Sequence, residues 1–242
     1  MNPTKLSAAD IAAYREQGYL KLGSILTADQ IRNFCDELSK MPPRPEDKGT
    51  LFFTQKRGGS KLLSDFAAKG PQVAAMNTLI GPNLRCWFDQ FVVKAPGESK
   101  GVFPWHQDNG YNGPQPDNNI TVWIALDETT TENGCIWVVP GSHKQGAIPH
   151  KKKSAESWHI EVDVPDNGLA VLLKPGEAVA FTGYTLHRSL GNKTDKPRRA
   201  FFLEYCDADA HFADGTPINQ RPTTDLFAGG LSPVITGTSK FT

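Results

Sequence analysis

Several features are scarce or missing in this sequence of 242 residues, and each absence narrows what the protein can be. No apolar run is long enough to cross a bilayer, and the N-terminal residues carry no apolar signal region. The four cysteines are widely separated and form no C-x-x-C pair, which argues against a disulfide framework or a thiolate zinc site. We therefore expect a cytoplasmic protein in a reducing compartment.

An excess of charge of either sign is also missing. Lys and Arg together number 26, as do Asp and Glu, so the formal net charge is zero. No global field favours nucleic acid or an anionic membrane surface, and we expect a small-molecule partner instead. The length suits one large domain over residues 1–242, whereas the oligomeric state has no signature in the sequence.

The first third of the chain is predicted to be mostly helical. Residues 7–17 have helical character, and Thr27 with Gln30 forms a capping box that opens a second helix. A third helix is expected over 71–80. The Pro- and Gly-rich segment 42–61 carries adjacent aromatics including Phe53, which suggests either a lid over a site or a surface loop held down by its aromatics.

Strand patterns dominate from residue 84 onward. Many short β-branched and aromatic segments, separated by turns, predict a mainly β fold, a sandwich or jelly roll, rather than βαβ units. The N-terminal helices would pack on the outside of one sheet. We expect a core over 84–206, helical support over 7–82 and a tail over 207–242. The predicted strands are 84–94, 119–127, 135–139, 169–173, 178–182 and 198–206.

Two stretches carry candidate chemistry. In an extended strand His106 and Asp108 would point to the same face, and an imidazole plus a carboxylate, completed by a second His, is the ligand set of non-heme Fe(II) oxygenases. Alone, an H-x-D pattern is equally typical of a loop with a capping Asp. Further along, His187 ends a strand and a basic pair opens the next one. If these strands pair, Arg198 or Arg199 returns beside His187 and can capture a carboxylate.

Together these stretches resemble the phytanoyl-CoA dioxygenase family of Fe(II)/2-oxoglutarate oxygenases. The resemblance is strong over about 84–206, and its order and spacing are far more specific than H-x-D alone. The matching stretches are WHQDNGY at 105–111, TVWIALD at 121–127, NGCIWVVPGSH at 133–143, LKPGEAVAF at 173–181, HRSLGN at 187–192 and PRRA at 197–200.

The resemblance implies a double-stranded β-helix of the cupin-like, jelly-roll type, with His106, Asp108 and His187 as ligands of Fe(II). It also implies 2-oxoglutarate and O2 as co-substrates and hydroxylation of an unactivated C–H bond of a small molecule, with release of succinate and CO2. In halogenating relatives a small residue replaces the carboxylate ligand, so Asp108 indicates hydroxylation.

The family arginine falls eleven residues after the second histidine, which makes Arg198 the anchor of the far carboxylate of 2-oxoglutarate, helped by Ser189. Apolarity of the strand would instead turn the face of Arg199 inward, so Arg199 is the alternative. Other residues expected to contact the co-substrate are Thr121, Trp123, Gln90 and Lys94, and those expected to contact substrate are Asn109, Tyr111 and Phe53.

Two other functions remain open. A cupin-type metalloenzyme that does not use 2-oxoglutarate would share the fold and the imidazole ligands, but would not need an arginine after the second histidine. A non-catalytic jelly roll that binds metal or ligand would usually have lost a metal ligand, and all three are present here.

Overall fold

We obtained a computed structural model of the chain. It describes residues 2–42, 49–54, 59–111, 119–153, 159–164, 167–212, 214–218 and 234–239. None of the helices in these ranges is both long and apolar enough to cross a membrane.

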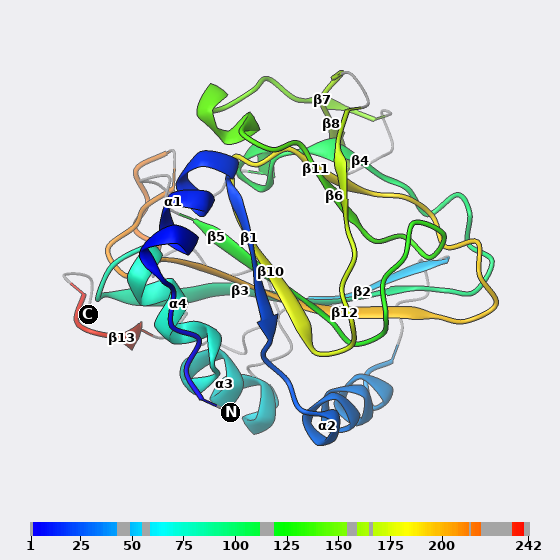
Figure 1. The fold of residues 1–242 in the computed structure, drawn as a ribbon, viewed down its shortest axis with the longest axis horizontal. Helices are drawn as coiled ribbons and strands as arrows, with labels where there is room; N and C mark the ends of the chain where they lie inside the picture. Colours follow the sequence, from blue (N-terminus) through cyan, green and yellow to red (C-terminus); the bar gives the residue numbers. More distant parts are fainter. Residues whose placement is uncertain are drawn as a thin grey trace.

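Two antiparallel sheets lie face to face and form the body of the protein (Figure 1). The larger, seven-stranded sheet has the order β1-β10-β5-β12-β3-β13, and β2 also pairs with β3. Its strands are β1 (Tyr19–Ser24), β2 (Thr50–Thr54), β3 (Leu84–Lys94), β5 (Ile120–Ala125), β10 (Glu177–Thr182), β12 (Arg198–Asp207) and β13 (Val234–Thr236). The smaller sheet, in the order β4-β11-β6-β9, contains β4 (Phe103–His106), β6 (Ile136–Val138), β9 (Leu169–Val171) and β11 (His187–Ser189).

Four helices precede most of the sheet in the chain. They are α1 (Ala8–Gln17), α2 (Ala28–Ser39), α3 (Lys61–Lys69) and α4 (Gln72–Leu79). Ser7 and Thr27 cap α1 and α2 through capping boxes, and Gly18 ends α1 in the left-handed conformation at φ 79°. The helices expected over 7–17 and 71–80 and after Thr27 are thus present, and α3 is an additional helix. The short elements are β7 (Lys151–Lys152), β8 (Ile160–Glu161), and the 3-10 turns η2 (Asp108–Tyr111) and η3 (Ser142–Gln145).

The larger hydrophobic core lies between these helices and one face of the seven-stranded sheet. Phe34 of α2 is buried there, with its ring centroid 5.1 Å from that of Phe66 and 5.4 Å from that of Phe201. A second cluster joins the two sheets, where Trp123 and Phe181 pack against Ile136. The predicted mainly β jelly roll with helices packed on one sheet is therefore confirmed.

Strand β12 has two buried faces, which explains its nearly continuous apolar sequence. Phe201 and Leu203 point toward the helices and belong to the larger core, whereas Ala200 and Phe202 point into the space between the sheets. Successive side chains of a strand alternate between faces. The more apolar face of β12, which carries Phe201 and Leu203, is therefore the face that the helices cover. The other face borders the interior between the two sheets.

Two expectations about connections were wrong. Strands β11 and β12 lie in different sheets, so the strand of His187 does not pair with that of Arg198. The aromatic segment within 42–61 is the strand β2, in which Phe53 pairs with Phe91 of β3, rather than a lid or a loop. The rest of that predicted lid, at 43–48 and 55–58, lies outside the described residues.

Candidate metal centre

Three potential metal ligands converge between the sheets. His106 ends β4, Asp108 begins η2, and His187 begins β11, where it pairs with His106 across the ladder. Their ligand atoms all lie within 4.8 Å of one another. Oδ1 of Asp108 is 3.4 Å from Nε2 of His187 and 3.7 Å from Nε2 of His106. Asp108 is thus directed at the histidines from a 3-10 turn and not, as predicted, from the strand of His106.

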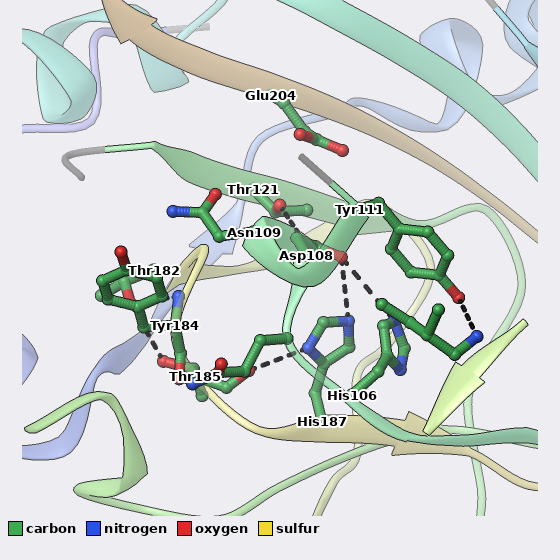
Figure 2. A network of polar contacts seen from close by, with 12 residues as sticks. His106, Asp108, Asn109, Tyr111, Thr121, Thr182, Tyr184, Thr185, His187 and Glu204 are labelled. Atoms are coloured by element: carbon green, nitrogen blue, oxygen red, sulfur yellow. Dashed lines mark hydrogen bonds and ion pairs between the residues drawn. The ribbon is translucent and has the colours of Figure 1, made fainter. Parts of the chain in front are cut away.

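Neighbouring groups hold each of these side chains in a metal-binding orientation, and Figure 2 shows the contacts of His187 with Thr185 and of Asp108 with Thr121. Nδ1 of His106 lies 2.8 Å from the Pro104 carbonyl, and Nδ1 of His187 lies 3.0 Å from the Thr185 carbonyl. When Nδ1 donates to a carbonyl, Nε2 is left as the lone-pair donor for a metal. The hydroxyl of Thr121 donates to Oδ2 of Asp108 at 2.6 Å, which leaves Oδ1 facing the histidines.

The charges at the centre are coupled. Burial, together with the adjacent His187, lowers the pKa of His106 to about 3, so His106 is neutral at physiological pH. Burial alone would raise the pKa of Asp108, but His187, together with His106 and the Thr121 hydrogen bond, outweighs this effect and the pKa falls to about 2. The same attraction overcomes burial at His187 and raises its pKa. A carboxylate beside two buried imidazoles is a donor set that can bind a divalent cation.

The geometry fits a metal ion. Nitrogen and oxygen ligands at ~2.1 Å from a metal, placed at right angles, lie about 3 Å apart. The observed separations of 3.4 and 3.7 Å are within one ångström of that value. Two imidazoles and one carboxylate on one side of a metal leave further positions open, which suits Fe(II) chemistry with O2 better than a closed structural site.

A cavity of about 320 Å³ opens from this centre and is lined by residues of both sheets. Its size is at the lower end of the range for small-molecule sites. Its walls are largely aromatic, and the aromatic side chains that line it include Phe52, Trp87, Phe88, Phe103, Trp123 and Phe202.

The structure distinguishes the two arginines that begin β12. Arg198 lines the cavity and is 1% exposed, and its Nε and Nη1 have no hydrogen-bond partner in the part of the chain that the structure describes. Burial lowers the pKa of Arg198 to about 10, so the guanidinium stays charged. Arg199 points to the opposite face and pairs with Asp127, with Nη2 2.7 Å from Oδ1. Because neighbouring residues of a strand point to opposite faces, only Arg198 borders the cavity.

Arg199→Ala is expected to change stability slightly and leave ligand binding intact. The side chains of Arg199 and Asp127 are 34% and 24% exposed, so water screens the ion pair, and its loss is worth about 1 kcal/mol at most. Denaturant unfolding measures the change in stability, and calorimetric titration measures the affinity for 2-oxoglutarate. A large loss of that affinity would show that Arg199 is the residue that binds the co-substrate.

Other predicted site residues divide into two groups. Five border the cavity: Ser189, Thr121, Trp123, Gln90 and Tyr111. Three do not. Lys94 is fully buried and its Nζ donates to the Gly101 carbonyl, while burial beside Arg198 lowers its pKa to about 6. Asn109 accepts a hydrogen bond from Asn119 at 3.2 Å. Phe53 packs in the helix-side core, and its neighbour Phe52 borders the cavity because of strand alternation.

The sequence reasoning missed several cavity residues. Glu204 and Phe202 lie on the Arg198 face of β12, and their period-two spacing from Arg198 was a usable signal. Arg188 lies beside His187, with its guanidinium 4.6 Å from the centre of the Trp105 ring. Phe103 begins the strand that ends in His106. Trp87 and Phe88 carried no comparable signal, because each face of β3 mixes apolar with polar residues, such as Asp89 on one face and Gln90 on the other.

Fold and site together define a jelly-roll protein with a candidate centre of two histidines and one carboxylate, the set found in non-heme Fe(II) oxygenases. The sequence model of the family phytanoyl-CoA dioxygenase (PhyH) matches residues 14–200. The chain belongs to that family.

Individual relatives agree with this assignment. The chain is 31% identical to the peroxisomal phytanoyl-CoA dioxygenase of Homo sapiens over 233 residues, covering 83% of this chain and 68% of that protein. It is 27% identical to the methylphosphonate hydroxylase of Gimesia maris, covering 84% and 81%. It spans 63% of the phytanoyl-CoA dioxygenase of Arabidopsis thaliana and 64% of the rice protein, less than two thirds of either.

Solved structures share the fold at low sequence identity. The epimerase SnoN, in complex with Fe3+, α-ketoglutarate and nogalamycin RO, has a TM-score of 0.72 and 23% identity, with 95% of each chain covered. EctD from S. alaskensis, with 2-oxoglutarate and 5-hydroxyectoine, has a TM-score of 0.74 and 20% identity, covering 99% of this chain and 89% of the other.

Proposed function

We propose that the protein is a non-heme Fe(II)- and 2-oxoglutarate-dependent oxygenase that hydroxylates an unactivated C–H bond of a small molecule, releasing succinate and CO2. The observation that carries the proposal is the buried guanidinium of Arg198, whose Nε and Nη1 have no hydrogen-bond partner among the described residues and which borders the same cavity as His106, Asp108 and His187. A buried charge needs a counter-ion, and a planar guanidinium suits a carboxylate. Membership of the phytanoyl-CoA dioxygenase family supports the same reading.

Each residue has a definite part in this function. Nε2 of the two histidines and Oδ1 of Asp108 would hold Fe(II), and Thr121 keeps the Asp108 carboxylate turned toward it. Arg198 would bind the far carboxylate of 2-oxoglutarate, with Ser189 near it on the cavity wall. Bound iron would activate O2, the oxidant, and 2-oxoglutarate would supply two of the electrons for that activation as it is converted to succinate and CO2.

The walls of the cavity orient the substrate and exclude water. Trp123 packs against the Arg198 guanidinium, whose carbon lies 5.3 Å from the centre of a Trp123 ring. This cation–π contact helps to hold the guanidinium in place on the cavity wall. Phe103 and Phe181 flank the histidines, with ring centroids 5.3 Å from His106 and 4.5 Å from His187. Apolar surroundings of this kind strengthen the electrostatic contacts inside the site.

The compartment is also a proposal. All four cysteines lie in the described ranges and are free thiols. Free thiols persist where glutathione and thioredoxin keep cysteines reduced, which supports a cytoplasmic location. The neutral overall charge supports a small-molecule substrate and gives no support for a nucleic-acid or membrane partner.

Anaerobic titration of 2-oxoglutarate into the Fe(II)-loaded protein tests the proposal. We expect a weak visible charge-transfer absorption band to appear as 2-oxoglutarate binds, and substrate turnover to yield succinate. If iron-loaded, folded protein develops no band, the proposal fails and a cupin-type metalloenzyme that does not use 2-oxoglutarate becomes the better reading. If the protein binds iron and shows the charge-transfer band but forms no succinate with any substrate, a non-catalytic binding protein would be favoured instead.

A further inference from the structure

The cavity wall also carries a carboxylate that the centre described above does not use. Glu204 lies on β12 and is 7% exposed. It pairs in register with Thr121 on β5, and Figure 2 shows its carboxylate directed from β12 toward the strand that carries Thr121. The carboxylate therefore lies on the cavity wall near the metal centre.

The negative charge of the Glu204 carboxylate is poorly compensated by the described residues around it. Its one hydrogen bond in the described part of the chain is from Nδ2 of Asn119, at a long 3.4 Å. Among the described residues no Lys, Arg or His lies at ion-pair distance from it. Burial and the charge of Asp108 together raise the pKa of Glu204 well above its usual value. A buried carboxylate without a cation is costly, so a bound molecule that brings a positive charge would be favoured there.

Aromatic side chains surround the same part of the cavity. Trp87, Phe88 and Phe202 all border it and are half-buried. The rings of Phe88 and Phe202 are stacked with centroids 5.8 Å apart, and those of Trp87 and Phe88 are 5.6 Å apart. Asn119 fixes both groups, because it accepts from Nε1 of Trp87 and donates to Glu204. Aromatic faces beside a carboxylate form a site that suits an ammonium group.

The position of Glu204 along β12 separates it from the proposed co-substrate site. Arg198 and Glu204 are on the same face of the strand but six residues apart, roughly 20 Å along it. Arg198 pairs in register with Lys94 at one end of the strand, whereas Glu204 lies opposite Thr121, the residue that holds Asp108. The anionic co-substrate and the Glu204 carboxylate therefore lie toward different ends of the cavity. The end that carries Glu204 is left for the substrate.

We propose that Glu204, with Trp87, Phe88 and Phe202, binds a cationic group of the substrate, a protonated amine or a quaternary ammonium. This inference rests on the proposed oxygenase function and names the class of its substrate. It also separates the chain from enzymes whose substrates carry an anion at this end, because the Glu204 carboxylate would repel a phosphonate or a carboxylate placed beside it.

The test uses two probes of the same shape. Choline carries a trimethylammonium group, and 3,3-dimethylbutan-1-ol carries a neutral tert-butyl group in its place. Both are titrated by calorimetry into protein loaded anaerobically with Fe(II) and 2-oxoglutarate. We expect choline to bind at least ~10-fold more tightly, because only the ammonium gains from the carboxylate and the aromatic faces.

Three variants locate the effect. Glu204→Gln keeps the shape and should weaken choline ~10- to 100-fold while leaving the neutral alcohol unchanged. Phe88→Leu should weaken choline more than the alcohol. Glu128→Gln removes a charge from an exposed position and is the matched control, with no change expected for either probe.

The outcomes separate this inference from the proposed function. The charge-transfer band reports 2-oxoglutarate binding, whereas the choline and 3,3-dimethylbutan-1-ol titrations report the cation site. The proposed function and the cation site can therefore fail independently of each other. Equal affinity for the two probes, no detectable choline binding to folded protein, or an unchanged choline affinity in Glu204→Gln would each overturn the cation site. Tighter binding of methylphosphonate than of choline would overturn it as well.

Discussion

Asp108→Ala is expected to reduce the affinity for Fe(II) by more than ~100-fold and to abolish turnover. The carboxylate is the only anion in the candidate ligand set, and its Oδ1 lies within 3.7 Å of both imidazole Nε2 atoms. Changes to groups that merely orient a ligand already cost 10- to 100-fold in metal affinity, so loss of the ligand itself should cost more. Equilibrium Fe(II) titration and succinate formation measure the two effects.

Thr121→Val provides a graded comparison for that experiment. It removes the hydroxyl that donates to Oδ2 of Asp108 but keeps the carboxylate, so Fe(II) affinity should fall by about 10- to 100-fold at most. Unfolding curves of the metal-free proteins show whether either variant has lost its fold. If folded Asp108→Ala bound Fe(II) within tenfold of the wild type, the metal centre would have to lie elsewhere.

Arg198→Gln is expected to weaken 2-oxoglutarate binding by ~100-fold or more and to leave Fe(II) affinity unchanged. Truncating one partner of a buried, hydrogen-bonded charge pair costs several kcal/mol, and each 1.4 kcal/mol is a tenfold change. The charge-transfer band should then need much higher 2-oxoglutarate to saturate. Arg199→Ala is the matched control, because its guanidinium pairs with Asp127 on the other face of the strand.

Stability without ligand gives an independent readout for Arg198. The guanidinium is buried, and no described residue is a hydrogen-bond partner of its Nε or Nη1, so its removal should not lower the free energy of unfolding of the protein without 2-oxoglutarate. Added 2-oxoglutarate should raise the unfolding midpoint of the wild type and not that of Arg198→Gln. A variant with normal 2-oxoglutarate affinity would show that another residue anchors the co-substrate.

Local sequence patterns predicted several of the helices and strands correctly. The capping residues Ser7 and Thr27 act on groups three residues away, so the starts of α1 and α2 could be read directly. The long strands β3 and β12 were marked by β-branched and aromatic residues over ten positions or more. The sequence analysis missed helix α3 because it follows a segment dominated by proline, glycine and charged residues. It missed β2 because pairing with β3 in the sheet decides the conformation of that segment.

What the sequence by itself determined about the site was the set of residue types and their spacing. His106 and Asp108 are two residues apart, so they stay close in almost any backbone geometry, and the eleven-residue interval from His187 to Arg198 singled out one arginine through the family resemblance. The tertiary structure decided which face of each strand borders the cavity. Helices cover one face of β12, so its apolar residues could not indicate the interior between the sheets.

The same limit applies to Phe53 and Glu204. A strand buried on both faces has no polar side to orient it, and only the position of α2 to α4 places Phe53 in the core and Phe52 on the cavity wall. Glu204 is an ordinary acidic residue in the sequence. It becomes a buried carboxylate, with no cation near it among the described residues, only because β5, β3 and the turn after β4 close around it. They bring Asn119, Phe88 and Asp108 together from distant parts of the chain.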